Sequence, residues 1–201
     1  MQQKRTSAQR DGVEETLRPI VISLATQPLP GLKDTLWYLL RRTRLALRAD
    51  TATVLLFEEN SLRWSPIAAD GLSEMSGANA SPTGRSQQEL EQTSPVPLGL
   101  TIARQIAKSR SGLIFHNVVE MAVISRSARE PVRSVAGVPL RVGDRLRGVL
   151  YVGSLAPLNF EEKDLLILRF VGERAAAAIE RERVLQAKAR ALTLPRTGTT
   201  T

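Results

Sequence analysis

Paired β-prone runs, separated by a long polar stretch, constrain most strongly how this chain can fold. Each run is rich in β-branched and apolar residues and is bounded by turn-forming residues, a pattern typical of strands. Two pairs of runs are joined by short turns, one at Glu59-Asn60-Ser61 and one around Gly143-Asp144, and these pairs predict two hairpins. The predicted strands cover residues 51–58, 62–68, 112–116, 134–140 and 147–155.

Helical periodicity accounts for much of the remaining chain, because apolar residues recur every three or four positions. The predicted helices cover residues 12–26, 32–48, 100–109 and 161–191. Residues 27–31 separate the first two, since proline cannot continue a helix. The apolar face of the second helix is expected to consist of Leu36, Leu39, Leu40, Leu45 and Leu47. This order of elements predicts an α+β domain in which helices cover a sheet.

Composition excludes several kinds of chemistry. The chain has 201 residues, which suits one domain with appendages. It has no cysteine, so disulfides, Fe–S clusters, thiolate metal sites and covalently attached bilins are excluded. A single histidine, His116, also excludes a metal centre built from several histidines.

The formal net charge of +8 raises the question of nucleic-acid binding. Counted along the sequence, the positive excess is spread over both ends and over residues 112–160, while residues 51–111 are slightly acidic. Aromatic residues make up only 4%, which is too few for a base-stacking surface. We therefore interpret the charge as a solvated surface, and nucleic acid is not an expected partner.

The sequence also bears on location. No run approaches the roughly 20 apolar residues that span a bilayer, and residues 1–15 lack the apolar core of a signal peptide. We expect a cytoplasmic protein with no membrane association. Residues 194–198, Leu-Pro-Arg-Thr-Gly, resemble a sortase signal but lack its hydrophobic stop and basic tail, so we interpret them as a coincidence.

Local sequences in these elements resemble the GAF domain, a sensory relative of the PAS fold. The resemblance lies in residues 49–56 (Ala-Asp-Thr-Ala-Thr-Val-Leu-Leu), 134–140 (Ser-Val-Ala-Gly-Val-Pro-Leu), 147–153 (Arg-Gly-Val-Leu-Tyr-Val-Gly) and 160–162 (Phe-Glu-Glu) with the apolar helix that follows. It implies a central antiparallel sheet of five or six strands, with the terminal helices on one face and loops and short helices on the other. The corresponding division is an N-terminal helix and linker in 1–29, the GAF domain in 30–183, and the helix end with a disordered tail in 184–201.

The resemblance also implies where a small molecule would bind. The candidate pocket lies around the third strand, with a mainly apolar lining: Leu113, Phe115, His116, Val118, Met121, Ile124, Arg133 and Val138. The alternative is that the apolar side chains simply fill a closed core. For His116, a surface position is favoured over a haem ligand or a proton-sensing switch.

Arginines near the last strands are a second candidate group, because guanidinium groups bind anions in bidentate fashion. They are Arg126, Arg129, Arg133, Arg141, Arg145 and Arg147, and a solvated surface is the favoured interpretation. The family's cysteine-dependent reductase and bilin-binding activities do not fit a chain without cysteine, and no other catalytic motif is found.

We therefore expect a non-enzymatic sensory module that works as a homodimer through its N- and C-terminal helices. It would bind an unidentified small molecule or relay a signal to a partner protein. The alternative is a ligandless dimerisation or interaction module of a signalling pathway, and a regulator associated with nucleic acid ranks lowest.

Overall fold

A computed structural model describes residues 31–59, 61–71, 100–118, 132–157 and 160–193. The elements follow the predicted order. They are α2 (Leu32–Ala46), β1 (Thr51–Glu58), β2 (Arg63–Asp70), α4 (Leu100–Lys108), β3 (Leu113–Phe115), β4 (Ser134–Val142), β5 (Arg145–Ser154) and α5 (Glu162–Thr193). The predicted helix 12–26 and the predicted tail from 194 onward lie outside the described residues.

The strands form one antiparallel sheet in the order β2-β1-β5-β4-β3. β1 therefore lies beside β5, with Thr53 opposite Tyr151, and β5 in turn lies beside β4. The described part of the chain confirms the expected α+β class with a five-stranded antiparallel sheet.

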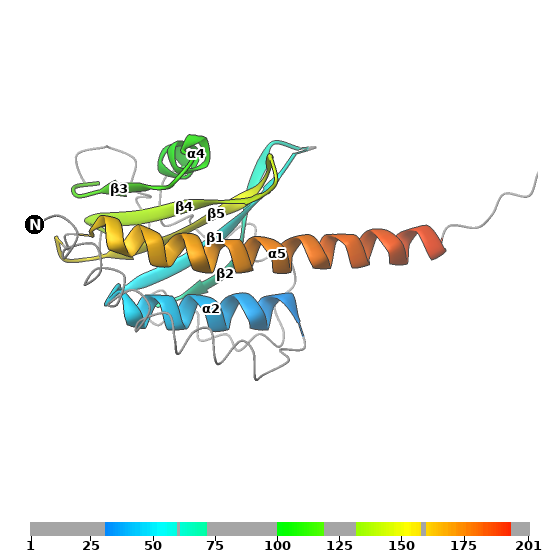
Figure 1. Ribbon diagram of the computed structural model, residues 1–201, viewed down its shortest axis with the longest axis horizontal. Coiled ribbons are helices and arrows are strands. Elements are labelled where there is room, and N and C mark those ends of the chain that lie inside the picture. Colours follow the sequence, from blue (N-terminus) through cyan, green and yellow to red (C-terminus); the bar gives the residue numbers. More distant parts are fainter. Residues whose placement is uncertain (1–30, 60, 72–99, 119–131, 158–159, 194–201) are drawn as a thin grey trace, which may run out of the picture.

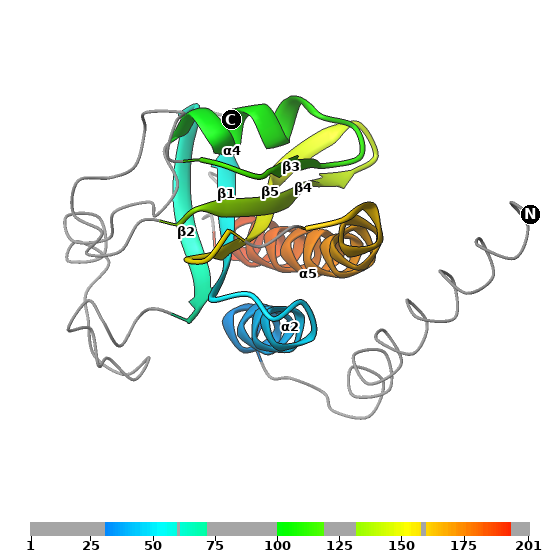
Figure 2. The same cartoon turned by 90° about the vertical axis from the view of Figure 1, so that its left-hand side faces the viewer.

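Helices cover both faces of this sheet, as Figures 1 and 2 show. Among the described helices, α2 and α5 lie side by side on one face and α4 lies on the other. Each face has its own buried apolar cluster, so side chains alternate between the two clusters along the strands. On β5, for example, Leu150 and Val152 face α2 and α5, while Val149 and Tyr151 face α4.

One residue of the predicted apolar face of α2 does not lie on its buried side. Leu36, Leu39 and Leu40 are almost completely buried, whereas Leu45 is 55% exposed. At about 100° per residue, Leu45 lies about 140° around the helix from Leu40. The prediction that Leu45 contributes to the core is wrong for this reason.

A bulge in β5 turns one charged side chain toward α5. The register shifts between Leu140 and Arg141 of β4, which leaves Arg147 as the extra residue on β5. The side chain of Arg147 is 6% exposed, and its Nε lies 2.6 Å from Oε2 of Glu180 on α5. Its Nη2 also donates a hydrogen bond to Oε1 of Glu180 (3.1 Å). This ion pair joins the middle of α5 to the sheet.

A second polar junction ties the start of β1 to the end of β5. One carboxylate oxygen of Asp50 accepts hydrogen bonds from the Ser154 hydroxyl (2.9 Å) and from the Leu155 N–H (2.8 Å). The Asp50 N–H in turn donates to the Gly153 carbonyl (2.9 Å). These bonds fix the end of the two inner strands where α2 leads into β1.

α5 is longer than the sheet that it covers. Figure 1 shows its C-terminal part projecting past the strands, and every residue from Val184 to Leu192 is exposed. The helix continues to Thr193, two residues beyond its predicted end at residue 191. No helix in the described ranges carries an apolar stretch of membrane-spanning length.

Candidate ligand-binding face

The face of the sheet beneath α4 is a buried, mainly apolar layer. Its strands contribute Leu55, Val135 and Val149, and α4 packs Ile102 and Ile106 onto them. Half-buried aromatic residues border it, with the rings of Phe57 and Trp64 5.0 Å apart. α4 places its apolar side on the sheet because Ile102, Ala103 and Ile106 recur at helical spacing.

One polar atom stands out in this layer, the hydroxyl oxygen of Tyr151. The residue is 1% exposed, and its hydroxyl has no hydrogen bond of good geometry to any described residue. Burial raises the pKa of Tyr151 well above its ordinary value, and the nearby Thr53 hydroxyl, which lowers the pKa, offsets only part of that effect. The phenol is therefore protonated throughout the physiological pH range and can donate a hydrogen bond.

An unsatisfied buried hydroxyl is costly, by about 1–3 kcal/mol. Native structures contain few such groups, and each one calls for an explanation. The Thr53 side chain, on the neighbouring strand and 2% exposed, supplies a second hydroxyl to the same place. Together the two hydroxyls form a small polar centre in a buried apolar layer.

The structure brings only some of the predicted pocket residues to this face. Leu113 and Phe115 on β3 pack against the α4-side cluster, and Val118 is buried within it. The backbone N–H of Val118 donates to the Arg133 carbonyl (2.9 Å), which holds this segment next to β4. Val138 lies on the opposite face, in the cluster formed with α2 and α5, and is not brought together with the others.

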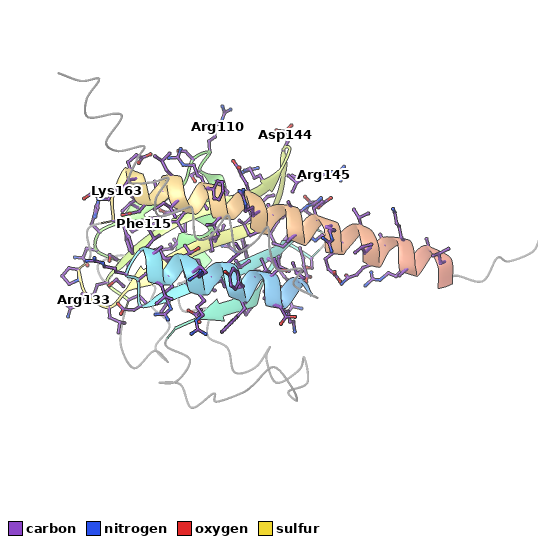
Figure 3. The ribbon with its side chains drawn as sticks, turned by 60° about the horizontal axis from the view of Figure 1, so that its bottom comes forward. Arg110, Phe115, Arg133, Asp144, Arg145 and Lys163 are labelled. Atoms are coloured by element: carbon purple, nitrogen blue, oxygen red, sulfur yellow. The ribbon has the colours of Figure 1, made fainter. Side chains whose placement is uncertain are left out.

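The remaining predicted residues are exposed or undescribed. His116 is exposed just beyond β3, and Arg133 is exposed just before β4. Met121 and Ile124 lie outside the described residues. Figure 3 shows Phe115 and Arg133 at the end of the domain where α5 begins.

The predicted arginine group does not form one site. Arg147 pairs with Glu180 on the α5 side, and Arg141 binds the carbonyl of Ala107 at the end of α4 (2.8 Å). Arg145 is exposed at the hairpin turn, and Arg126 and Arg129 fall outside the described residues. Within the described segments, no three His, Asp or Glu side chains gather as metal ligands.

Sequence reasoning missed Tyr151 and Thr53. A signal was present, because Tyr151 is the one residue with a polar side chain in the buried run 148–153. Its significance depends on which strand lies opposite, and the pairing of Tyr151 with Thr53 follows only from the sheet order.

Comparison with known families decides what kind of domain carries this face. The family model described as "GAF domain" matches residues 31–180, most of the chain. This chain belongs to the GAF domain family. The match covers every described strand and α2, α4 and most of α5, so the predicted family is confirmed.

Solved structures agree with this GAF assignment at the level of the fold. The GAF domain of a phosphoenolpyruvate-protein phosphotransferase from Acinetobacter has a TM-score of 0.64 at 19% identity, with 85% of this chain and 93% of that chain covered. The GAF domain of a putative sensor histidine kinase from Pseudomonas syringae pv. tomato has a TM-score of 0.55 at 17% identity, covering 92% and 97%.

An enzyme is also among the similar folds. The free methionine-R-sulfoxide reductase from Neisseria meningitidis has a TM-score of 0.61 at 18% identity, covering 86% of this chain and 91% of that chain. Identities this low show a shared fold alone. No curated protein matches this GAF domain.

Proposed function

We propose that this GAF domain is a non-enzymatic sensory module that binds a small molecule on the sheet face beneath α4. The observation that carries the proposal is the buried Tyr151 hydroxyl, which lacks a well-formed hydrogen bond among the described residues. GAF domains are typical sensory and signalling modules, and a GAF domain of a putative sensor histidine kinase shares this fold. The absence of cysteine argues against thiol-based catalysis on this scaffold.

The chemistry of the face limits the ligand. The phenol of Tyr151 donates a hydrogen bond, and the hydroxyl of Thr53 can donate or accept one. The residues packed around them are apolar or aromatic. The ligand therefore presents a hydrogen-bond acceptor, such as a carbonyl oxygen or a ring nitrogen, on an uncharged apolar body.

Strand β5 provides a route from this face to α5. It carries Tyr151 toward α4 and, at its bulge, carries Arg147 toward Glu180 of α5. A ligand that binds one position of β5 better than another shifts the equilibrium between the two positions by that difference in affinity. Because Arg147 joins β5 to α5, the position of α5 shifts with it. The exposed end of α5 is the expected output surface.

The expected homodimer uses the same output surface. Val184, Leu185 and Leu192 are exposed apolar residues on the projecting part of α5. Two copies that pair their α5 helices would cover these side chains and receive the ligand signal together. The alternative, a ligandless interaction module, uses this surface without any ligand on the other face.

The test compares two tyrosine variants of the full chain, Tyr151→Phe and Tyr38→Phe. Each removes one phenol oxygen, but Tyr38 lies on α2 at the other face of the sheet. Native mass spectrometry first asks whether a small molecule co-purifies, and a thermal-shift screen with uncharged metabolites follows.

We expect a ligand that stabilises the wild type and Tyr38→Phe and loses most of this effect with Tyr151→Phe. Stabilisation that is equal in all three proteins would remove Tyr151 from the site. No bound molecule and no stabilisation by any metabolite would favour the ligandless module.

A further inference from the structure

Five exposed basic side chains lie on or just after α4 and on the β4–β5 hairpin that α4 contacts. We call them the α4–hairpin patch: Arg104, Lys108, Arg110, Arg141 and Arg145. All except Arg110 belong to α4, β4 or β5, and Arg110 lies two residues after the end of α4. All five residues are exposed.

A hydrogen bond fixes the two halves of the patch to each other. Nη2 of Arg141 donates to the carbonyl oxygen of Ala107, in the last turn of α4 (2.8 Å). Nη1 of Arg141 also donates to the carbonyl of Asp144 in the hairpin turn (3.2 Å). Figure 3 shows Arg110, Asp144 and Arg145 on the same side of the domain.

The patch is poorly neutralised by the described part of the chain. Asp144 is the carboxylate within its own elements, and Glu59 lies beside the hairpin, with Oε1 3.8 Å from Nη1 of Arg147. None of the ion pairs among the described residues includes a patch cation. Two of the five have structural roles, since Lys108 suits the negative end of the α4 dipole and Arg141 binds its carbonyl. Arg104, Arg110 and Arg145 have no such role in the described structure.

The charge count along the sequence could not reveal this cluster. Residues 51–111 are slightly acidic as a whole, but their described carboxylates, Glu58, Glu59 and Asp70, belong to β1, β2 and the turn between them. The fold places the basic end of α4 next to the β4–β5 hairpin, which is more than 30 residues away in the sequence.

The kind of partner follows from what the patch lacks. The described exposed large apolar residues all lie elsewhere: Trp37, Leu45, Leu62, Leu166, Val184, Leu185 and Leu192. Protein hot spots and membrane-surface helices both use aromatic or large aliphatic anchors, and single-stranded nucleic acids use aromatic stacking. Phosphate contacts on a duplex need only arginine, lysine and small polar groups.

We propose that the α4–hairpin patch binds the phosphate backbone of double-stranded nucleic acid without reading its sequence. Four of the five cations are arginines, whose guanidinium groups match phosphate oxygens in bidentate fashion. α4, the segment that follows it and Arg141 lie across the sheet from α2 and α5, so these four cations are available whether or not these helices pair with another copy. Arg145 lies opposite Val142, at the edge of the patch on the α5 side of the hairpin. The proposal is independent of the ligand site at Tyr151.

Fluorescence anisotropy of a labelled duplex of ~20 base pairs tests the proposal with the full chain, in NaCl from about 50 to 200 mM. The patch variant is Arg104→Gln with Lys108→Gln and Arg110→Gln. The matched control is Lys33→Gln with Arg41→Gln and Arg181→Gln, which removes the same charge from exposed positions on α2 and α5.

We expect the wild type to bind with a Kd of about 1–100 μM near physiological salt, and log K to fall with log salt at a slope of about −3 to −4. The patch variant should lose at least about tenfold in affinity and reduce the magnitude of the slope by about 2 to 3. The control should change the affinity less than about threefold.

Three results would overturn the proposal. The first is no binding by the wild type at about 50 mM salt, and the second is an equal loss in both variants, which would indicate net charge alone. The third is binding to polyglutamate or to phosphatidylserine vesicles but not to the duplex, which would identify another class of partner. If the triple patch variant does not fold, Arg110→Gln with Arg145→Gln, both outside α4, replaces it under the same criteria.

Discussion

Replacing Tyr151 with phenylalanine should stabilise the ligand-free protein. The substitution keeps the ring, which is 1% exposed and packed beneath α4, and removes a hydroxyl without a well-formed hydrogen bond. A buried hydroxyl without a partner costs about 1–3 kcal/mol. Because the Thr53 hydroxyl offsets part of this cost, we expect the free energy of unfolding to rise by about 1 kcal/mol, equivalent to about 2–4 °C in Tm.

Urea unfolding followed by fluorescence measures this change, since the chain has two tryptophans on different elements, Trp37 in α2 and Trp64 in β2. Protein stripped of any co-purified molecule is required, because a ligand bound to Tyr151 would reverse the comparison. An unchanged slope of free energy against urea would show that the native packing is preserved. A loss of stability above about 0.5 kcal/mol, the value of an ordinary hydrogen bond, would refute the claim that the hydroxyl lacks a good partner.

The buried Tyr151 hydroxyl also predicts that the free energy of unfolding falls at alkaline pH. Burial raises the pKa of Tyr151 in the folded protein above the value near 10 of an unfolded chain. The folded state therefore holds the proton more tightly, and stability falls by about 1.4 kcal/mol per pH unit once the pH exceeds about 10. Tyr151→Phe should remove this fall. Tyrosinate absorbance of Tyr38→Phe, in which Tyr151 is the remaining tyrosine, should appear only as the protein unfolds.

Other changes test the packing of β5 and the end of α5. Arg147→Met should lower the free energy of unfolding in urea by about 2 kcal/mol, which is less than for a fully buried pair because Glu180 is 28% exposed. Adding Glu180→Gln should recover part of this loss. No loss in Arg147→Met would mean that the pair does not hold α5. Gly148→Ala should lower the free energy of unfolding by about 3 kcal/mol or more, because the added Cβ would overlap the backbone of β1. Gly143→Ala has open space around the added Cβ but a φ of 58°, so it should lower the free energy of unfolding by about 1–2 kcal/mol. Equal losses of Tm in the two glycine variants would contradict this account. Leu185→Glu should weaken self-association in sedimentation without lowering Tm, since this side chain is half exposed; an unchanged dimer would place the contact elsewhere.

Much of the secondary structure could be predicted because local patterns determine it. The prediction for 51–58 coincides with β1, where β-branched and apolar residues end at a polar turn. At the β4–β5 hairpin, the predicted strands are too short, because Arg141 and Arg145 look like loop residues in the sequence. In the structure both remain in the ladder up to a two-residue turn.

The faces of the sheet were harder to predict. β4 is apolar on both sides, so alternation could not tell whether Val138 faces α4 or α5. A shift of one residue exchanges the two faces of a strand. Thr53 and Tyr151 show the same limit, since their proximity depends on a pairing between distant parts of the chain. The basic patch at α4 needed the same long-range information.

The strand order also has a consequence for synthesis on the ribosome. β1 pairs with the last strand, with Thr51 opposite Gly153 about 100 residues later, so a nascent chain exposes the inner edge of β1 until β5 emerges. An unpaired edge of this kind invites association with other chains. Growing polypeptides of this domain should therefore be targets for chaperones until residue 154 has emerged from the ribosome.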